Sequence, residues 1–391
     1  MNLDKLIPQK INFYKSISNQ QNLLNANILD SNVLVIGGAG TIGSSYIKQI
    51  LKYKPSSITV VDINENGLTE LTRDLRSSNL LDYNPEYITY PVNLLSDTFV
   101  KIFNSNTWQV VANFSAHKHV RSEKDKISVE ALIKNNVYGA IKLLNLCEGN
   151  PPSYFFSVST DKAANPVNIM GASKSLMEKL IISKKNIFRV STARFANVAF
   201  SNGSLLDGFI YRLQKQQPLS CPSDIKRFFV TPEQSGQICL LATFLGETGN
   251  IFFPKLDFHK DQIYFKDIAL DFLKENGFEP VLVQSEEEAK EFDFDKNPTK
   301  YPIYFFKTDT SGEKTYEEFF TEEEDYEINK YDSLGFINTL DVVISFEEVE
   351  TDFDLVFRDA SSQKSDIVEI IKKYVSDFEH IETGKHLDQK M

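Results

Sequence analysis

Long hydrophobic runs and cysteines are both scarce in this sequence of 391 residues. It contains no stretch of about 18 apolar residues, the length that a membrane-spanning helix needs, and the N-terminus MNLDKLIPQK lacks an apolar signal segment. The three cysteines, Cys147, Cys221 and Cys239, are far apart and follow no metal-ligand pattern, as in proteins of a reducing compartment. We therefore expect a cytoplasmic protein with no membrane span and no cleaved leader.

Positive charge is also in short supply, because 42 lysines and arginines stand against 54 acidic residues and give a formal net charge of -12. Nucleic-acid binders gather Lys and Arg into a basic stripe, and this sequence has none. His117 and His119 would share one face of a strand, but no third metal ligand follows at a suitable spacing. We expect neither a nucleic-acid partner nor a metal site, so local groups hold any anionic ligand.

Short β-branched runs that alternate with helical stretches are what the sequence does contain. These runs lie at 33–36, 58–61, 87–92, 110–114, 154–158 and 188–192. Apolar strands separated by helices are typical of a parallel sheet, so we predict an α/β protein with a Rossmann-type doubly wound sheet and a smaller C-terminal substrate-binding lobe. The expected parts are an N-terminal arm (1–32), an NAD-binding Rossmann domain (33–194), the lobe (195–330) with an insertion near 252–310, and a C-terminal extension (331–391).

A glycine-rich turn, GGAGTIG at 37–43, follows the first expected strand and precedes a helix. Gly37 permits a tight turn, Gly40 lets the backbone approach a pyrophosphate, and Gly43 lets the helix pack closely on the strand. The first helical residues, Thr41 and Ile42, offer free backbone N–H groups to the phosphates.

The second expected strand ends in Asp62, at the place where a carboxylate accepts hydrogen bonds from a ribose. A carboxylate there favours NAD, because it repels the 2′-phosphate of NADP. Arg73 and Arg76 lie downstream and leave NADP as the second choice.

Three different functional groups follow the fifth expected strand, namely the hydroxyl of Thr160, the acid of Asp161 and the amine of Lys162, and Lys174 lies on the next helix. Parallel sheets bind their ligands at this carboxyl edge. A strand-end turn capped by Thr160 and Asp161, with no ligand, is the alternative interpretation.

Three longer stretches carry a family resemblance: NFSAHKHV at 113–120, STDKAANPVNIMGASK at 159–174 and SGEKTYEEFFT at 311–321. Together they resemble the polysaccharide-biosynthesis dehydratases, which convert UDP-N-acetylglucosamine, or the GDP form in the legionaminic-acid branch, to a 4-keto-6-deoxy sugar. The general short-chain dehydrogenase pattern has a Tyr four residues before the Lys, where this sequence has Met170. The substitution resembles a Met-type branch of these dehydratases, and it leaves open whether Thr160, a water held by Lys174, or Lys162 deprotonates the 4-hydroxyl.

The resemblance implies an internal redox loop, in which hydride leaves C4 for NAD, water leaves C6, and the hydride returns to C6. Lys162 would take the C5 proton, its pKa lowered by burial and by Lys174. Asp161 would protonate the departing hydroxyl, Thr160 would bind the 4-oxygen, and Lys174 would hold the nicotinamide ribose.

The resemblance also implies further contacts. Asn136 would order the active-site end of the sheet. The remaining residues would contact the cofactor or a nucleotide-activated N-acetylhexosamine, Arg227 through the diphosphate: Ala116, His117, Lys118, Asn197, Ser204 and Arg227.

A sugar-nucleotide 4-epimerase, a ketoreductase and a non-catalytic NAD-binding regulator remain as alternatives, and an epimerase has no use for the Asp161–Lys162 pair. Related enzymes commonly pair through two helices, which here correspond to 127–146 and 171–183. We therefore expect a homo-oligomer whose contact includes apolar residues of these helices, such as Leu132, Leu143, Leu176 and Leu180.

Overall fold

The computed structural model describes residues 3–7, 11–309, 312, 314 and 316–382. Its centre is a nine-stranded sheet, in which the strands lie in the order β14-β15-β10-β6-β5-β4-β1-β2-β3. The strands are β1 (Asn32–Ile36), β2 (Ser57–Asp62), β3 (Glu86–Pro91), β4 (Val110–Asn113), β5 (Tyr154–Val158), β6 (Val190–Ala193), β10 (Ile251–Pro254), β14 (Tyr326–Glu327) and β15 (Leu334–Ile337). All neighbours from β3 to β10 are parallel, and β15 and β14 pair antiparallel at one edge. The predicted Rossmann-type α/β fold is thereby confirmed.

The strands are hydrophobic throughout because helices cover both faces of the sheet. In β1, Val33 and Val35 belong to one core cluster, and Leu34 and Ile36 belong to the other. Side chains that alternate between two buried faces explain why this run is continuously apolar.

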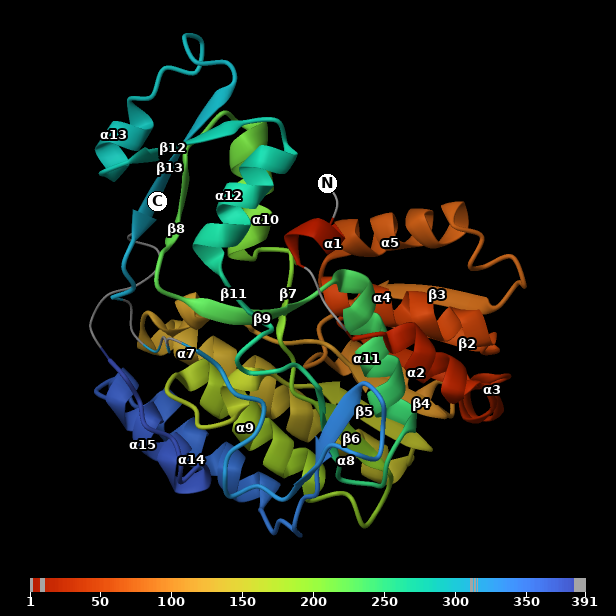
Figure 1. Cartoon of the computed structure of the whole chain (residues 1–391). Coiled ribbons are helices and arrows are strands. Elements are labelled where there is room, and N and C mark those ends of the chain that lie inside the picture. Colours follow the sequence, from red (N-terminus) through yellow and green to blue (C-terminus); the bar gives the residue numbers. More distant parts are fainter. Residues whose placement is uncertain (1–2, 8–10, 310–311, 313, 315, 383–391) are drawn as a thin grey trace.

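One face of the sheet is covered by α4 (Thr41–Ile50), α5 (Glu65–Ser77) and α11 (Pro232–Phe244). The expected N-terminal arm forms α2 (Phe13–Asn19) and α3 (Gln21–Ile28), whose Phe13, Leu24 and Ile28 are buried in the same cluster. The arm is therefore part of this helical layer (Figure 1).

The other face carries α6 (Asp97–Asn104), α7 (Lys126–Ile133), α8 (Gly139–Gly149) and α9 (Ile169–Ile182). The helix expected over 127–146 contains a π-helical segment, Lys134–Tyr138, between α7 and α8. Such π-turns are frequent at functional sites.

The lobe stands on the sheet at the carboxyl ends of its central strands (Figure 1). It has two three-stranded sheets, built from β7 (Asn197–Val198), β9 (Lys226–Val230) and β11 (Gln262–Tyr264), and from β8 (Leu219–Pro222), β12 (Glu279–Val283) and β13 (Lys300–Phe306). Its helices are α10 (Leu205–Gln214), α12 (Phe265–Glu275) and α13 (Glu286–Lys290), and the short α1 (Leu3–Leu6) contacts α12. The segment 195–330, expected as a lobe, also supplies α11, β10 and β14 to the main body.

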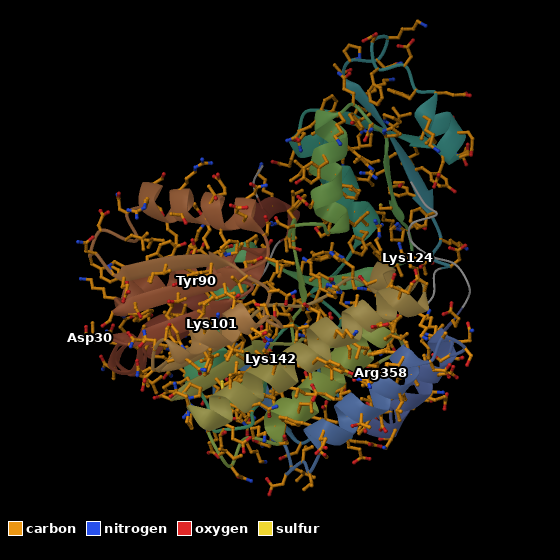
Figure 2. All side chains as sticks on the ribbon, turned by 180° about the vertical axis from the view of Figure 1, so that it is seen from behind. Asp30, Tyr90, Lys101, Lys124, Lys142 and Arg358 are labelled. Carbon is orange, nitrogen blue, oxygen red and sulfur yellow. The ribbon has the colours of Figure 1, made fainter. Side chains whose placement is uncertain are left out.

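The C-terminal extension forms α14 (Phe346–Arg358) and α15 (Lys364–Tyr374), and α15 packs on α7 and α9. Seen from behind, α14 with Arg358 lies on the outer side of the molecule (Figure 2). The four leucines expected at a dimer contact are fully buried in the core cluster that these two helices complete. The proposed contact through those leucines is therefore wrong, because the chain covers them itself, and the homo-oligomer stays a prediction.

Within the described ranges, no helix combines the length and the apolar character that crossing a membrane requires.

Candidate active site

The glycine turn has the geometry that its sequence predicts. Gly37 adopts φ 75°, and a Cβ at this residue would lie 2.5 Å from the backbone nitrogen of Ser115 after β4. A Cβ on Gly43 would lie 2.4 Å from the carbonyl oxygen of Gly37, so only glycine lets α4 pack on the turn. The nearest atom to a Cβ on Gly40 would be 3.5 Å away, which leaves the backbone open to a ligand.

The first turn of α4 and the end of β2 contribute the polar groups beside the glycine turn. Gly40 is the N-cap of α4, and no side chain of the described residues caps this helix. The carboxylate of Asp62 accepts hydrogen bonds from Ala39 N at 3.0 Å and Asn64 N at 2.9 Å. Uncapped N–H groups of Thr41 and Ile42 beside a carboxylate fit a dinucleotide.

Asn136, in the π-turn, fixes the loop after β4. Its Oδ1 accepts from His117 N at 2.8 Å, and its Nδ2 donates to His117 O at 3.1 Å and to Ser173 Oγ at 3.0 Å. One amide thus ties the loop that contains Ala116 to helix α9, which carries Lys174.

The residues 117–119 lie in an irregular loop and not in a strand. Burial lowers the pKa of His117, and burial together with Lys118 and other cations lowers that of His119 to about 4, so both are neutral at pH 7. Lys118 donates to Asn202 O at 3.0 Å, and Asn202 N donates to Thr41 Oγ1 at 3.0 Å. The lobe therefore touches the glycine turn through residue 202.

Asp161 and Lys162 lie in a turn of 3-10 helix after β5, with Thr160 as its N-cap. Oδ1 of Asp161 accepts from Thr160 Oγ1 at 2.9 Å and from Lys162 Nζ at 3.1 Å. Oδ2 of Asp161 is buried and accepts no hydrogen bond from the described residues. Oδ2 is therefore available to accept a hydrogen bond from a ligand or a water.

A second carboxylate, Glu317, faces this cluster from the third family motif. Its Oε1 lies 3.7 Å from Lys162 Nζ and 3.6 Å from Arg227 Nη2, and its side chain is 3% exposed. Burial favours the neutral form of Lys162, but Asp161 and Glu317 outweigh it and raise the pKa of the ammonium. The expectation of a lowered pKa for Lys162 is therefore wrong, because the charges of Asp161 and Glu317 together outweigh burial.

Lys174 and Met170 lie one turn apart on α9. Lys174 is buried, donates to Val158 O at 2.7 Å, and has a pKa lowered by burial to about 8. Met170 is buried in the apolar cluster of this face of the sheet.

The lobe residues Asn197 and Ser204 already make protein contacts. Asn197 Nδ2 donates to Phe228 O at 3.4 Å, and Ser204 Oγ accepts from Asp207 N at 3.2 Å as the N-cap of α10. Of the third motif, Ser311, Glu313 and Thr315 lie outside the described residues.

Two further buried carboxylates were not found from the sequence. Glu123 accepts hydrogen bonds from Ile169 N at 2.9 Å and Met170 N at 2.8 Å, and burial raises its pKa to about 7. Glu178 accepts from Arg194 Nη2 at 2.8 Å. Neither carries a local signal, because the partner of each is distant in the sequence.

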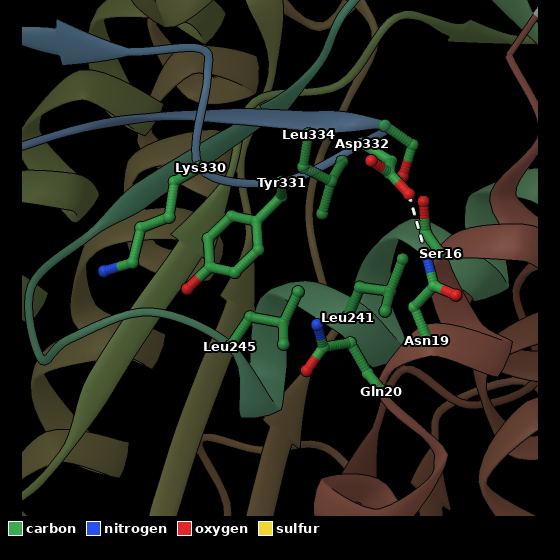
Figure 3. A pocket seen from close by; sticks show the side chains of 10 residues that line it. Ser16, Asn19, Gln20, Leu241, Leu245, Lys330, Tyr331, Asp332 and Leu334 are labelled. Carbon is green, nitrogen blue, oxygen red and sulfur yellow. Dashed lines mark hydrogen bonds between the residues drawn. The ribbon is translucent and has the colours of Figure 1, made fainter.

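A small cavity of about 110 Å³ lies between α2, α11 and the segment before β15 (Figure 3). Its lining includes Ser16, Gln20, Leu241 and Tyr331, and none of the residues expected in the active site.

Comparisons with known proteins bear on the family and the fold. Residues 33–339 match a family described as polysaccharide biosynthesis protein. A protein of Methanocaldococcus jannaschii, named an uncharacterized membrane protein, is 30% identical over 312 residues, which cover 78% of this chain and 85% of that protein. The UDP-N-acetylglucosamine 4,6-dehydratase (inverting) of Campylobacter jejuni is 29% identical over 234 residues, 58% of this chain and 67% of the enzyme.

Longer proteins match over only part of their length. The capsular polysaccharide biosynthesis protein CapD of Staphylococcus aureus is 27% identical over 261 residues, which cover 65% of this chain and 42% of CapD.

Solved structures share the fold. Pen from Bacillus thuringiensis has a TM-score of 0.66 at 22% identity, over 84% of this chain and 98% of Pen. A DesIV double mutant, a dTDP-glucose 4,6-dehydratase of Streptomyces venezuelae with NAD bound, has a TM-score of 0.55 at 16% identity, over 73% of this chain and 87% of DesIV.

Proposed function

Because this chain belongs to the polysaccharide biosynthesis protein family, we propose that it is a nucleotide-sugar 4,6-dehydratase for UDP- or GDP-N-acetylglucosamine. The observation that carries the proposal is the ion pair of the buried Asp161 and the partly buried Lys162 at the carboxyl end of β5, with an unsatisfied carboxylate oxygen. The Campylobacter relative named for this reaction supports the same substrate class.

The cofactor in this proposal is NAD. Its pyrophosphate would lie at the start of α4 on the open backbone of Gly40, and Asp62 would accept from the ribose. Bound NAD would supply a hydride acceptor at C4 and a hydride donor at C6, with no net oxidation.

The residues of the chain would divide the proton transfers. Thr160 would bind the 4-oxygen, and the 4-hydroxyl proton would pass to Thr160, to a water held by Lys174 or to Lys162. Lys162 would take the C5 proton and return it when the hydride adds to C6, and Asp161 would protonate the leaving 6-hydroxyl. Since the pKa of Lys162 is raised by Asp161 and Glu317, the lysine must lose a proton before it acts as a base. Lys174 would contribute positive charge beside the ribose.

A nucleotide-sugar 4-epimerase is the rival function, because it uses the same fold and cofactor site. It needs no acid for a leaving hydroxyl, so the Asp161–Lys162 pair favours the dehydratase.

The decisive experiment is mass measurement on a panel of UDP- and GDP-N-acetylhexosamines incubated with the full chain and NAD. Loss of one water from a sugar nucleotide supports the dehydratase. Unchanged mass with an inverted 4-hydroxyl, read from the NMR spectrum of the recovered sugar nucleotide, would replace it by the epimerase, and a change of two hydrogens would indicate a ketoreductase.

A further inference from the structure

One buried carboxylate oxygen lies between the expected catalytic lysine and the expected diphosphate-binding arginine. Glu317 Oε1 is 3.7 Å from Lys162 Nζ and 3.6 Å from Arg227 Nη2, and the three side chains are 3%, 17% and 4% exposed, respectively. Opposite charges at such distances interact more strongly when buried than at a surface. On the basis of the proposed function, we propose that Glu317 is a positioning residue that couples Arg227 to Lys162 and stabilises the ammonium form of the lysine.

The fold holds Glu317 in place from the neighbouring residues of its segment. Arg194, at the end of β6, donates to Phe319 O at 3.0 Å and to Glu324 Oε2 at 2.8 Å. The same guanidinium is bound by Glu178 of α9. Arg194 thus anchors the backbone two residues after Glu317.

The charged groups around Lys162 act in opposite directions. Asp161 and Glu317 favour the ammonium, whereas Arg227 favours the neutral amine. Around Glu317, the cations are Lys162, Arg227 and Lys314, and Asp161 is the like charge. Removing the charge of Glu317 therefore makes Lys162 lose its proton at lower pH, and removing the charge of Arg227 has the reverse effect.

The shared oxygen links two events that are otherwise separate. A diphosphate bound by Arg227 would compete with Glu317 for the guanidinium, which changes how much of the carboxylate charge acts on Lys162. Binding of the nucleotide and protonation of the lysine are then linked, and linkage of this kind is reciprocal.

The test measures the titration of Lys162 directly, in the full chain without substrate. Acetic anhydride labels neutral amines, and mass spectrometry of the Lys162 peptide across a series of pH values gives the midpoint. We expect Glu317→Gln to lower the midpoint by about 1 unit or more and Arg227→Gln to raise it, with Glu317→Asp close to the wild type. The matched control is Glu318→Gln, since that carboxylate accepts from Asn165 at 3.3 Å outside the cluster.

An unchanged midpoint in Glu317→Gln, or an equal shift in Glu318→Gln, would overturn the proposal. If Glu317→Gln does not fold, as judged by its circular dichroism, the opposite variant decides: no upward shift in Arg227→Gln rejects the coupling.

The pH dependence of activity provides a second test. If the chain is a dehydratase, the acidic limb of the pH profile for the rate of C5 proton exchange shifts by the same amount as the labelling midpoint. A role that is merely structural would lower the rate without moving that limb. If no sugar nucleotide reacts with the wild type, the proposed function fails, and the labelling result still stands or falls by itself.

Discussion

The glycine turn and the Lys162 cluster lie at the carboxyl edge of one sheet, yet the first is built from backbone and the second from buried charge. At Gly37 and Gly43 of the turn, a Cβ would collide with backbone atoms. The cluster brings together Asp161, Lys162, Glu317 and Arg227 from three separate stretches of the chain.

This difference explains what the glycine turn and the Lys162 cluster each require. A backbone site needs close packing of neighbouring segments, so added volume damages it. A buried cluster of charges needs every partner, because the loss of one leaves another charge unpaired in a medium of low dielectric constant. Substitutions that add volume should therefore damage the glycine turn, and substitutions that remove a charge should damage the Lys162 cluster.

Lys162→Met should have the largest effect, because it removes a charge from the Lys162 cluster. We expect product formation to fall about 10²–10⁴-fold and exchange of the C5 proton with deuterated water to stop. Asp161→Asn should keep the exchange while product formation falls, since it removes the acid for the leaving hydroxyl. Mass spectrometry of recovered sugar nucleotides measures both, and the exposed Lys101→Met is the control. Wild-type exchange in Lys162→Met would move the base to another residue.

Gly43→Ala tests the close packing of α4 on the glycine turn. The new Cβ would lie 2.4 Å from Gly37 O and 2.8 Å from Gly38 Cα, so α4 must move away from the turn. We expect NAD affinity, measured by calorimetry, to fall about 100-fold. Gly149→Ala is the matched control, because a Cβ there would have no atom of the described residues within 4 Å. Similar losses in both variants would contradict the packing argument.

The sequence predicts the glycine turn better than the Lys162 cluster, because the signals for the turn are local. Strand periodicity and the spacing of Gly37, Gly40 and Gly43 fall within one short stretch, and the structure has the expected strand, turn and helix there. The partners of Lys162 and Met170 are distant in sequence, and no periodicity indicates that Glu317 or Glu123 will face them. The pKa direction of Lys162 was wrong because the charge of the adjacent Asp161, together with that of the distant Glu317, outweighs burial.

The expected dimer contact failed for a related reason. The apolar pattern of α7, α8 and α9 predicts a buried face, but it does not say which segment covers that face. In this chain α15, which follows more than a hundred residues later, packs on α7 and α9, and the leucines share their core cluster with residues of the sheet. Local patterns indicate burial, and the choice of partner depends on the whole chain.

The variant Glu123→Gln tests the buried carboxylate at the start of α9. Burial raises the pKa of Glu123 from 4.5 to about 7, so between these values the folded protein binds a proton that the unfolded chain has lost. Wild-type stability should therefore decrease as the pH rises from 5 to 7, by about 2 kcal/mol from this group. Urea unfolding of Glu123→Gln should lack this part of the slope. The surface variant Glu148→Gln is the control, and a slope equal to that of the wild type in Glu123→Gln would remove Glu123 as its source.

Asp62→Asn has the smallest expected effect. It removes a charge beside the glycine turn, the part of the site that is otherwise built from backbone groups. The carboxylate accepts from Ala39 N and Asn64 N, so it also braces the glycine turn. Asparagine keeps one acceptor oxygen and removes the negative charge. If Asp62 selects the cofactor, NAD binding should weaken about 10-fold, while NADP binding changes little or improves as the repulsion disappears. Calorimetry with both cofactors on one preparation measures the ratio. An equal loss for NAD and NADP would mean that Asp62 acts through the turn alone, and the glycine turn would then also depend on a partly buried charge and its partners.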